Sequence, residues 1–169
     1  CPAETPEGGA VGVVKNMALS CCITNYNDIK PIINIIESMD VRTISELRPV
    51  DIYKKTKIFI NGDWMYVTEN SKNIYQQLIS NRRLGKINIY TSIVWNIQDN
   101  ILDIKTTAGR CIRPLYILEN NKFKITNKHI KLFTDNIINW NNLLSGNIPR
   151  MYYGDIINEA VIEYLDIEE

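Results

Sequence analysis

Two carboxylates, Glu4 and Glu7, stand close together near the start of the chain, in a run that continues through Gly8. Prolines in this run fix the backbone and remove hydrogen-bond donors, and glycines allow close approach, so the run predicts a shaped loop without regular structure. Paired carboxylates can bind a metal ion or orient a cationic partner, and Lys15 can meet a phosphate. The pattern Glu-x-x-Glu is also typical of caps and solvated ion pairs, so it leaves the chemistry open.

The cysteines and the histidine are a second source of candidate ligands. The spacing of Cys1, Cys21, Cys22 and Cys111 matches neither a zinc site nor a disulfide framework. We expect the adjacent cysteines to be small buried apolar residues, and reduced thiols fit an intracellular compartment. His129 has no partner in sequence, so we expect a structural role for it. These residue types predict no metal site within the chain.

Composition and charge restrict the class of protein. With 169 residues, of which 45% are hydrophobic, the chain can bury the core of one or two small domains. Lys plus Arg and Asp plus Glu both number 19, so the formal net charge is zero. An independent duplex-DNA-binding protein usually carries a basic surplus. Any contact with nucleic acid is therefore expected to be local or to occur within a larger assembly.

Targeting segments and the start of the chain give further expectations. No stretch approaches the ~20 apolar residues of a membrane span, and no signal peptide is recognisable. The sequence starts at Cys1 without an initiator Met. We interpret this start as the boundary of an excised piece, with protein processing as the alternative.

The segment that carries the two glutamates is expected to be irregular before it becomes helical. Residues 1–12 are rich in Pro and Gly and predict a loop. An apolar run follows over 13–23, and isoleucines at helical spacing predict a helix over 28–39. A short helical turn is predicted over 43–47, followed by a connector.

The middle of the chain predicts a compact unit of two strands, a helix and three strands. Asn61-Gly62 predicts a hairpin turn, because both positions tolerate a positive φ. Asn70 or Ser71 is expected to cap the helix, which Gly85 would end. Pairing is expected to be mostly antiparallel. The expected strands cover residues 57–61, 64–67, 91–97, 101–106 and 111–118.

Three helices are predicted in the last third of the chain, over residues 127–133, 139–144 and 155–163. The predicted fold class is therefore α+β: a small mixed helix and antiparallel-strand domain, flanked by a loop-rich N-terminal segment and a helical C-terminal segment.

The run CPAETPEG at residues 1–8, followed by GVVKNMALSC at 12–21, resembles a family signature, CPxETPEG…GLVKNL. The family is the second-largest subunit of multisubunit DNA-directed RNA polymerases, in its archaeal, eukaryotic and large-DNA-virus branch. The bacterial β subunit shares ETPEG but lacks the pair Lys15-Asn16. A string of this length is far more specific than a short glycine-rich pattern.

Further strings fall in the family's order along the whole chain. They are FINGDW at 59–64, similar to FVNGVW; LISNRRLGK at 78–86, similar to LRxLRRxG; AGRCIRPL at 108–115, similar to DAGRxxRPL; and AVIEYLDIEE at 160–169, similar to GLVEYIDAEE. Two positions depart from the pattern. Val13 replaces a Leu, which is a mild change for packing. Thr107 replaces an Asp, and a Thr hydroxyl caps a turn less well.

The resemblance implies that the CPAETPEG loop ends the fork region, beside the RNA–DNA hybrid and the nucleotide-addition site. This would place Glu4, Thr5, Glu7 and Gly8 near the active centre, with Lys15 supporting the same network. We expect Glu7 to influence catalysis indirectly, by holding a neighbouring basic residue or loop in position. None of these residues is expected to be directly catalytic.

The same resemblance divides the chain into three parts. Residues 1–56 would be the end of the fork region, 57–118 an α+β module similar to external 2, and 119–169 a helical segment that returns toward the core. Ion pairs with nearby carboxylates are the alternative to a basic surface in the module, and the zero net charge favours them. The candidate basic surface consists of Arg82, Arg83, Arg110 and Arg113.

The reaction that the resemblance implies is nucleotidyl transfer to an RNA 3′ end, assisted by two Mg²⁺ ions. No Asp-x-Asp-x-Asp cluster occurs in the sequence, so the Mg²⁺ ligands are expected mainly outside this chain, which alone should be inactive. The expected partners are other polymerase subunits, especially the largest, the DNA template and the RNA–DNA hybrid, with no membrane. The expected location is intracellular: nucleus, cytoplasmic viral factory or virion.

Two other functions stay open on the sequence. The chain could serve mainly as a docking module for transcription factors, which the external module and the polar stretch 120–127 suggest. It could also be an independent metal-dependent nuclease that uses Glu4 and Glu7. No His or Asp at ligand spacing supports the nuclease.

Overall fold

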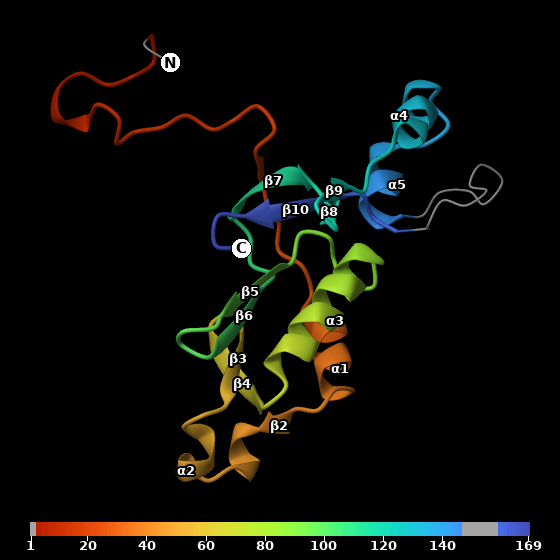
Figure 1. Cartoon of the computed structure of the whole chain (residues 1–169). Coiled ribbons are helices and arrows are strands. Elements are labelled where there is room, and N and C mark those ends of the chain that lie inside the picture. The colour runs from red at the N-terminus through yellow and green to blue at the C-terminus, as the bar shows by residue number, and fades with distance from the viewer. Residues whose placement is uncertain (1–2, 147–158) are drawn as a thin grey trace.

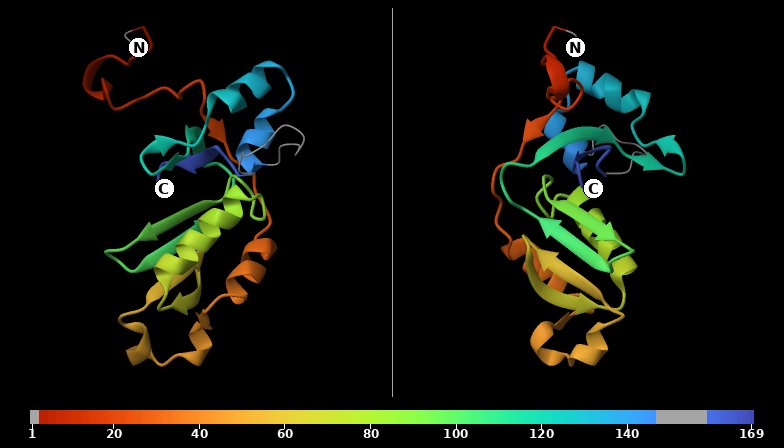
Figure 2. Two further views of the ribbon diagram at one scale, coloured as in Figure 1. Left: turned by 45° about the vertical axis from the view of Figure 1, so that its right-hand side comes forward. Right: turned by 90° about the vertical axis from the view of Figure 1, so that its left-hand side faces the viewer.

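The structure, a computed structural model, describes residues 3–146 and 159–169. The first described residues form an extended segment whose only helix is a short 3-10 turn, η1 (Gly8–Ala10). Figures 1 and 2 show this segment arching away from the rest of the chain. The predicted loop over residues 1–12 therefore agrees with the backbone wherever that backbone is described.

The larger sheet has five strands in the order β2-β4-β3-β6-β5. Neighbouring strands are antiparallel except β3 and β6, which are parallel. The parallel pair arises because β4, a helix and β5 intervene between these two strands. The strands are β2 (Arg42–Thr43), β3 (Thr56–Ile60), β4 (Asp63–Thr68), β5 (Ser92–Asn96) and β6 (Ile101–Lys105).

The hairpin between β3 and β4 turns at the predicted pair. Asn61 has φ 53° and Gly62 has φ 92°, the left-handed values that a two-residue hairpin loop requires. The side chain of Asn61 also fixes the end of β6, because its Oδ1 accepts a hydrogen bond from the backbone N–H of Thr106 at 2.7 Å. The hairpin prediction is confirmed.

Helices cover the sheet and complete its core. The predicted helices around residues 28–39 and 71–83 are confirmed as α1 (Lys30–Glu37) and α3 (Ser71–Arg83). Asn70 occupies the N-cap position of α3, but its side chain makes no capping bond and instead donates to Asp40. The other short helices are η2 (Ile44–Glu46) and α2 (Pro49–Ile52). The buried core consists of Ile32, Ile36, Ile58, Ile60, Tyr66, Ile74, Leu78, Ile87, Ile93, Leu102 and Ile104.

A second, three-stranded sheet has the order β1-β7-β10, with both pairings antiparallel. Its strands come from three distant parts of the chain: β1 (Cys22–Ile23), β7 (Cys111–Tyr116) and β10 (Ile162–Asp166). The strand predicted over 111–118 therefore exists, but it lies in this sheet and not beside β6. Figure 1 shows the second sheet stacked beyond the end of the first.

The C-terminal part adds two helices and a small hairpin. The helices α4 (Asn127–Thr134) and α5 (Trp140–Ser145) confirm two predictions, and β8 (Leu118–Glu119) pairs with β9 (Lys122–Phe123). The helix predicted over 155–163 lies partly outside the described residues. The described residues 159–161 are not helical, and strand β10 begins at Ile162. That part of the prediction is wrong. A second core consists of Ile112, Ile138, Leu143, Leu144, Val161, Ile162 and Tyr164.

The fold is thus mixed α and β with mainly antiparallel sheets, as predicted. Strands as well as helices follow residue 119. In the described ranges, no helix has the length and apolar character needed to cross a membrane.

Candidate functional site

The N-terminal loop presents its two glutamates to solvent. Glu4, Thr5, Glu7 and Gly8 are all exposed, and within the described residues neither carboxylate has a hydrogen-bond or ion-pair partner. Glu7 occupies the N-cap position of η1 without a side-chain capping bond, and Gly8 follows with φ 81°. Both carboxylates are therefore available to a group outside the described chain.

Lys15 lies apart from these glutamates, at the edge of an apolar cleft of about 460 Å³. The cleft lies between the N-terminal segment and the second sheet, and Met17, Cys21, Leu115 and Leu165 also line it. Nearby apolar side chains are unusually exposed, with Leu19 fully open to solvent. The structure thus does not bring Lys15 into a network with Glu4 or Glu7 through any hydrogen bond or ion pair of the described residues.

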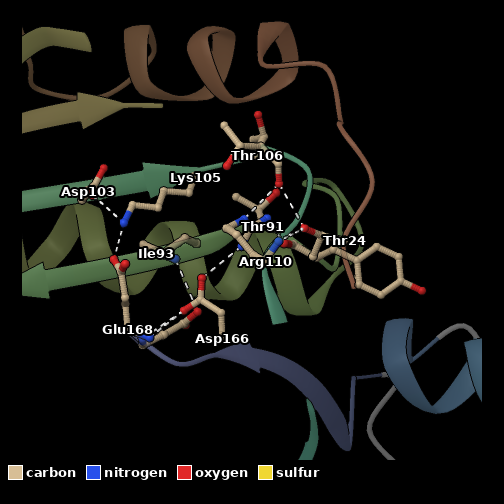
Figure 3. Close-up of polar contacts among 12 residues, drawn as sticks. Thr24, Thr91, Ile93, Asp103, Lys105, Thr106, Arg110, Asp166 and Glu168 are labelled. Carbon is tan, nitrogen blue, oxygen red and sulfur yellow. Dashed lines mark hydrogen bonds and ion pairs between the residues drawn. The ribbon is translucent and has the colours of Figure 1, made fainter. Parts of the chain in front are cut away.

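The N-terminal segment joins the two sheets at Thr24, which is 3% exposed (Figure 3). Its backbone N–H donates to the carbonyl of Arg110, and its carbonyl accepts from the N–H of Gly109, both at 2.9 Å. Its hydroxyl donates to the carbonyl of Thr107 at 3.0 Å and accepts from the N–H of Arg110 at 3.1 Å. Thr24 therefore provides hydrogen-bond partners for the backbone groups of the turn that leads from β6 into β7.

Arg110 fixes the other side of the same turn. Its guanidinium donates to the Asp166 carboxylate at 3.1 Å, to the Tyr90 carbonyl at 2.7 Å and to the Thr107 carbonyl at 3.0 Å. Burial opposes the charge of Asp166, but hydrogen bonds from Arg110 and from the backbone amides of Glu168 and Glu169 help to lower the pKa of this carboxyl. Figure 3 shows Arg110 between Thr24 and Asp166.

Arg82 is the most deeply buried cation of the described chain, with a side chain 2% exposed. Its guanidinium donates to both Glu169 oxygens, at 2.6 and 2.7 Å, to Glu163 at 3.2 Å and to the Thr91 carbonyl at 2.8 Å. Arg83 makes a bidentate pair with Glu163 at 2.8 and 3.0 Å. Two arginines of α3 thus bind two carboxylates near the end of the chain.

Burial and pairing shift the titration of this cluster in different directions. Burial disfavours the charged form of Arg82, but the hydrogen bonds and charges of Glu169 and Glu163 outweigh it and raise the pKa of Arg82. Burial is likewise outweighed at Glu163, where Arg83 and Arg82 lower the pKa. At Glu169 burial prevails, and the pKa is raised.

Lys105 completes a series of ion pairs along the last residues. It bonds to Glu168 and lies 3.3 Å from Asp103 (Figure 3). We call residues 163–169 the acidic segment, because its four carboxylates each contact a cation from an earlier part of the chain. Those four carboxylates belong to Glu163, Asp166, Glu168 and Glu169.

The four arginines predicted as a candidate basic surface thus do not share one environment. Arg82, Arg83 and Arg110 form ion pairs with the acidic segment, as in the alternative interpretation, whereas Arg113 is exposed and makes no ion pair with a described residue. The residues that sequence reasoning missed are Thr24 and Asp166. No local signal marks them, because their partners lie 86 and 56 positions away.

The turn at Thr107 is held by hydrogen bonds to its backbone groups and does not depend on a cap from the side chain at position 107. The Thr107 carbonyl accepts hydrogen bonds from Thr24 and Arg110. Asn61 bonds to the neighbouring Thr106. Side chains from other segments therefore hold the turn that an Asp at this position was expected to cap.

The described cysteines and the histidine differ in how far they are buried. Cys22 is exposed, which contradicts the expected burial, and Cys21 and Cys111 are half-buried. Burial and the adjacent Cys111 raise the pKa of the Cys21 thiol. His129 is buried and caps α4, so its structural role is confirmed. Within residues 3–146 and 159–169, no group of three or more His, Cys, Asp or Glu side chains can hold a metal ion.

Comparison with known proteins gives one consistent family. The family model for RNA polymerase Rpb2, domain 3, matches residues 1–23, and that for RNA polymerase Rpb2, domain 4, matches residues 58–119. The chain is 32% identical to DNA-directed RNA polymerase II subunit RPB2 of Meyerozyma guilliermondii over 182 residues. It is 34% identical to DNA-directed RNA polymerase II subunit 2 of Arabidopsis thaliana over 169 residues.

A subunit of another polymerase class matches as well. The chain is 30% identical over 171 residues to DNA-directed RNA polymerase III subunit RPC2 of Drosophila melanogaster. Each of these alignments covers 100% of the chain but 14% of the relative. The chain therefore spans a small part of the length of the curated relatives that it matches.

Proposed function

Since the chain belongs to the family of second-largest subunits of DNA-directed RNA polymerases, we propose that it forms part of the active-centre wall and outer scaffold of such an enzyme. It contributes a fork loop beside the nucleotide-addition site and takes part in DNA-templated RNA synthesis, without being catalytic alone. The observation that carries this proposal is the whole-chain similarity to polymerase subunits of two classes.

The proposed division of the chain follows the same family. Residues 1–56 are the end of the fork region, 57–118 the external 2-like module, and 119–169 a segment that returns toward the core. The two matched family domains support a boundary between residues 23 and 58. The five-stranded sheet supports a separate module, because four of its strands lie between residues 56 and 105.

The fork loop acts through charge and position. Glu4 and Glu7 are exposed and have no partner among the described residues, which suits carboxylates that meet a basic group of another part of the polymerase. Thr5, Gly8 and Lys15 belong to the same exposed segment. A carboxylate that fixes such a basic group would position it for the reaction without touching the reacting atoms.

The complete enzyme joins a nucleoside triphosphate to the RNA 3′ end, a reaction in which two Mg²⁺ ions stabilise the charge on the phosphates. The described residues of this chain do not fit a metal site. The proposed partners are therefore the other polymerase subunits, especially the largest, together with the DNA template and the RNA–DNA hybrid. Its proposed place is inside the cell, in the nucleus.

The test is transcript elongation by the complete polymerase carrying Glu7→Ala. We expect assembly to be intact and elongation to slow by about three- to tenfold, because an ion pair near a surface is worth about 1 kcal/mol. Glu46→Ala is the matched control, since Glu46 is also an exposed glutamate, at the end of the short 3-10 helix η2. That control is expected to elongate normally.

A docking module for transcription factors is the second candidate function. Two large apolar side chains, Val50 on α2 and Tyr53 at its C-cap, are about 85% exposed, which favours a protein partner at that end of the module. Normal elongation by the Glu7→Ala polymerase would argue against the active-centre role and leave the docking function as the better account.

A further inference from the structure

Among the described residues of the N-terminal segment, backbone hydrogen bonds to the rest of the chain begin at residue 22. Within the described residues 3–21, the backbone hydrogen bonds stay inside the segment, and the last joins the Cys21 N–H to the Ala18 carbonyl at 2.9 Å. Beyond it, β1 pairs with β7, and the Asn27 N–H donates to the Thr106 carbonyl at 3.1 Å. Residues 22–27 are therefore the anchor of the loop that carries Glu4 and Glu7.

Thr24 is the centre of this anchor. One buried residue makes four hydrogen bonds to the turn between β6 and β7, two through its backbone and two through its hydroxyl. Removing the hydroxyl would leave the Arg110 N–H without its acceptor in a partly buried place, which costs more than losing an exposed hydrogen bond would. The side chain, and not only the strand pairing, is thus needed to hold the segment.

Arg110 makes the turn a rigid support. Its guanidinium joins three separate pieces of chain: the turn itself, the connection at Tyr90 and the acidic segment at Asp166. The side chains of Arg110 and Asp166 are 12% and 5% exposed, so solvent screens this pair little. The turn that receives Thr24 is therefore held from the first sheet and from the second.

We propose that Thr24 and Arg110 are positioning residues, which hold the N-terminal loop in place beside the active centre of the polymerase. The inference rests on the proposed function for its consequence in catalysis, and on the hydrogen bonds alone for the anchoring. The effect of these two residues reaches the reaction through the place of the loop that carries Glu7.

The test of anchoring compares Thr24→Val, which removes the hydroxyl, with Thr24→Ser, which keeps it, in the complete polymerase. The measurement is amide hydrogen–deuterium exchange over residues 22–27 and 106–110, where the anchoring hydrogen bonds lie. We expect Thr24→Val to speed exchange there at least tenfold, because both hydrogen bonds of the hydroxyl are lost and ~1.4 kcal/mol already corresponds to a factor of ten, and Thr24→Ser to leave it unchanged. Unchanged exchange in Thr24→Val overturns the anchoring role.

A second pair of variants tests Arg110. Arg110→Lys keeps the charge but loses the guanidinium fork that reaches Tyr90 and Thr107, so we expect faster exchange over residues 106–110. Arg48→Lys is the control, because Arg48 also pairs with a carboxylate, Asp51, but is 84% exposed. Equal exchange in Arg110→Lys and Arg48→Lys contradicts the support role of Arg110.

Elongation kinetics connect the anchor to the reaction. We expect Thr24→Val to slow elongation, Thr24→Ser to restore it, and the double variant with Glu7→Ala to be no slower than Glu7→Ala alone, since both changes act through one loop. If the double variant instead slows elongation by the product of the two single-variant factors, the positioning role is overturned. Unchanged elongation in Glu7→Ala contradicts the proposed function only, because the exchange measurement decides the anchoring without it.

Discussion

His129 shows how a single side chain can make helix stability depend on pH. Its Nδ1 accepts a hydrogen bond from the backbone N–H of Thr126 at 3.1 Å and lies 2.8 Å from the Thr126 hydroxyl. Its Nε2 is buried and has no partner in the described residues. Burial lowers the pKa of His129 below its ordinary value of 6.5, so the neutral ring is the form that caps α4.

The free energy of unfolding should therefore fall as the pH is lowered from about 6.5. Below that pH the unfolded chain binds a proton that the folded chain, with its lowered pKa, does not. Above it both forms are neutral and the full stability is present. Urea unfolding at a series of pH values measures the slope, and His129→Gln, which can keep the capping box, is expected to reduce it. An equal slope in both chains would assign the effect to other groups.

The sequence identifies individual candidate residues but not the partners with which their side chains pair. Glu4 and Glu7 were found because they lie in one short run, and the exposed loop agrees with the Pro and Gly around them. The pairing of Arg82 and Arg110 was not predictable residue by residue, because their carboxylates lie 87 and 56 positions away. The charge of a buried arginine indicates that it needs a carboxylate partner, but it does not identify which carboxylate.

At the scale of elements, Gly146 ends α5 where a side chain would not fit. It has φ 66° and its N–H bonds back to the Asn142 carbonyl at 2.9 Å. A Cβ there would lie 2.4 Å from the backbone carbon of Glu159, just before β10. The helix end and the start of the last strand are thus in direct backbone contact.

We expect Gly146→Ala to lower the free energy of unfolding by about 3 kcal/mol or more, since it adds an overpacking clash to the backbone strain. Gly62→Ala is the matched control: Gly62 also has a positive φ, but an added Cβ meets nothing within 4 Å. Its cost should be about 1 kcal/mol. Urea denaturation followed by circular dichroism compares the two, and equal losses would contradict the contact at Glu159.

Helices, strands and turns that are determined by neighbouring residues were predicted well, whereas those that depend on pairing with distant segments were not. The turn at Asn61-Gly62 and the isoleucine spacing of α1 carry their own signals. The first two residues of β10 were predicted as the end of a helix over 155–163, because the short apolar run there fits both periods and only pairing with β7 selects the strand. For the same reason β7 was recognised as a strand, but its place in a second sheet, between β1 and β10, was not foreseen.

At the scale of the whole molecule, the acidic segment joins the two sheets. Its carboxylates reach Arg82 and Arg83 on α3, Lys105 at the end of β6 and Arg110 before β7. The pairs therefore fix the second sheet, through β10, against the first. A cleft of about 490 Å³ between α3 and β10 borders this contact.

Arg82→Leu should separate the sheets. It leaves Glu163 and Glu169 buried beside fewer cations, and breaking a buried pair from one side costs about 3–5 kcal/mol. Arg83, the other partner of Glu163, has a side chain that is 34% exposed. Arg83→Leu should therefore lower the free energy of unfolding by only about 1 kcal/mol. Urea unfolding measures both losses. Equal and small losses would mean that the acidic segment contributes little to the contact between sheets.

The strand order β1-β7-β10 also has a consequence for synthesis on the ribosome. β7 can pair with β1 as soon as it emerges, but its other edge stays open until β10, which begins 46 residues after β7 ends at Tyr116, has been translated. At roughly 5–20 residues per second that interval is about 2–9 s. During it the nascent chain carries an unpaired strand edge, the kind of surface that chaperones bind and that aggregates when they do not.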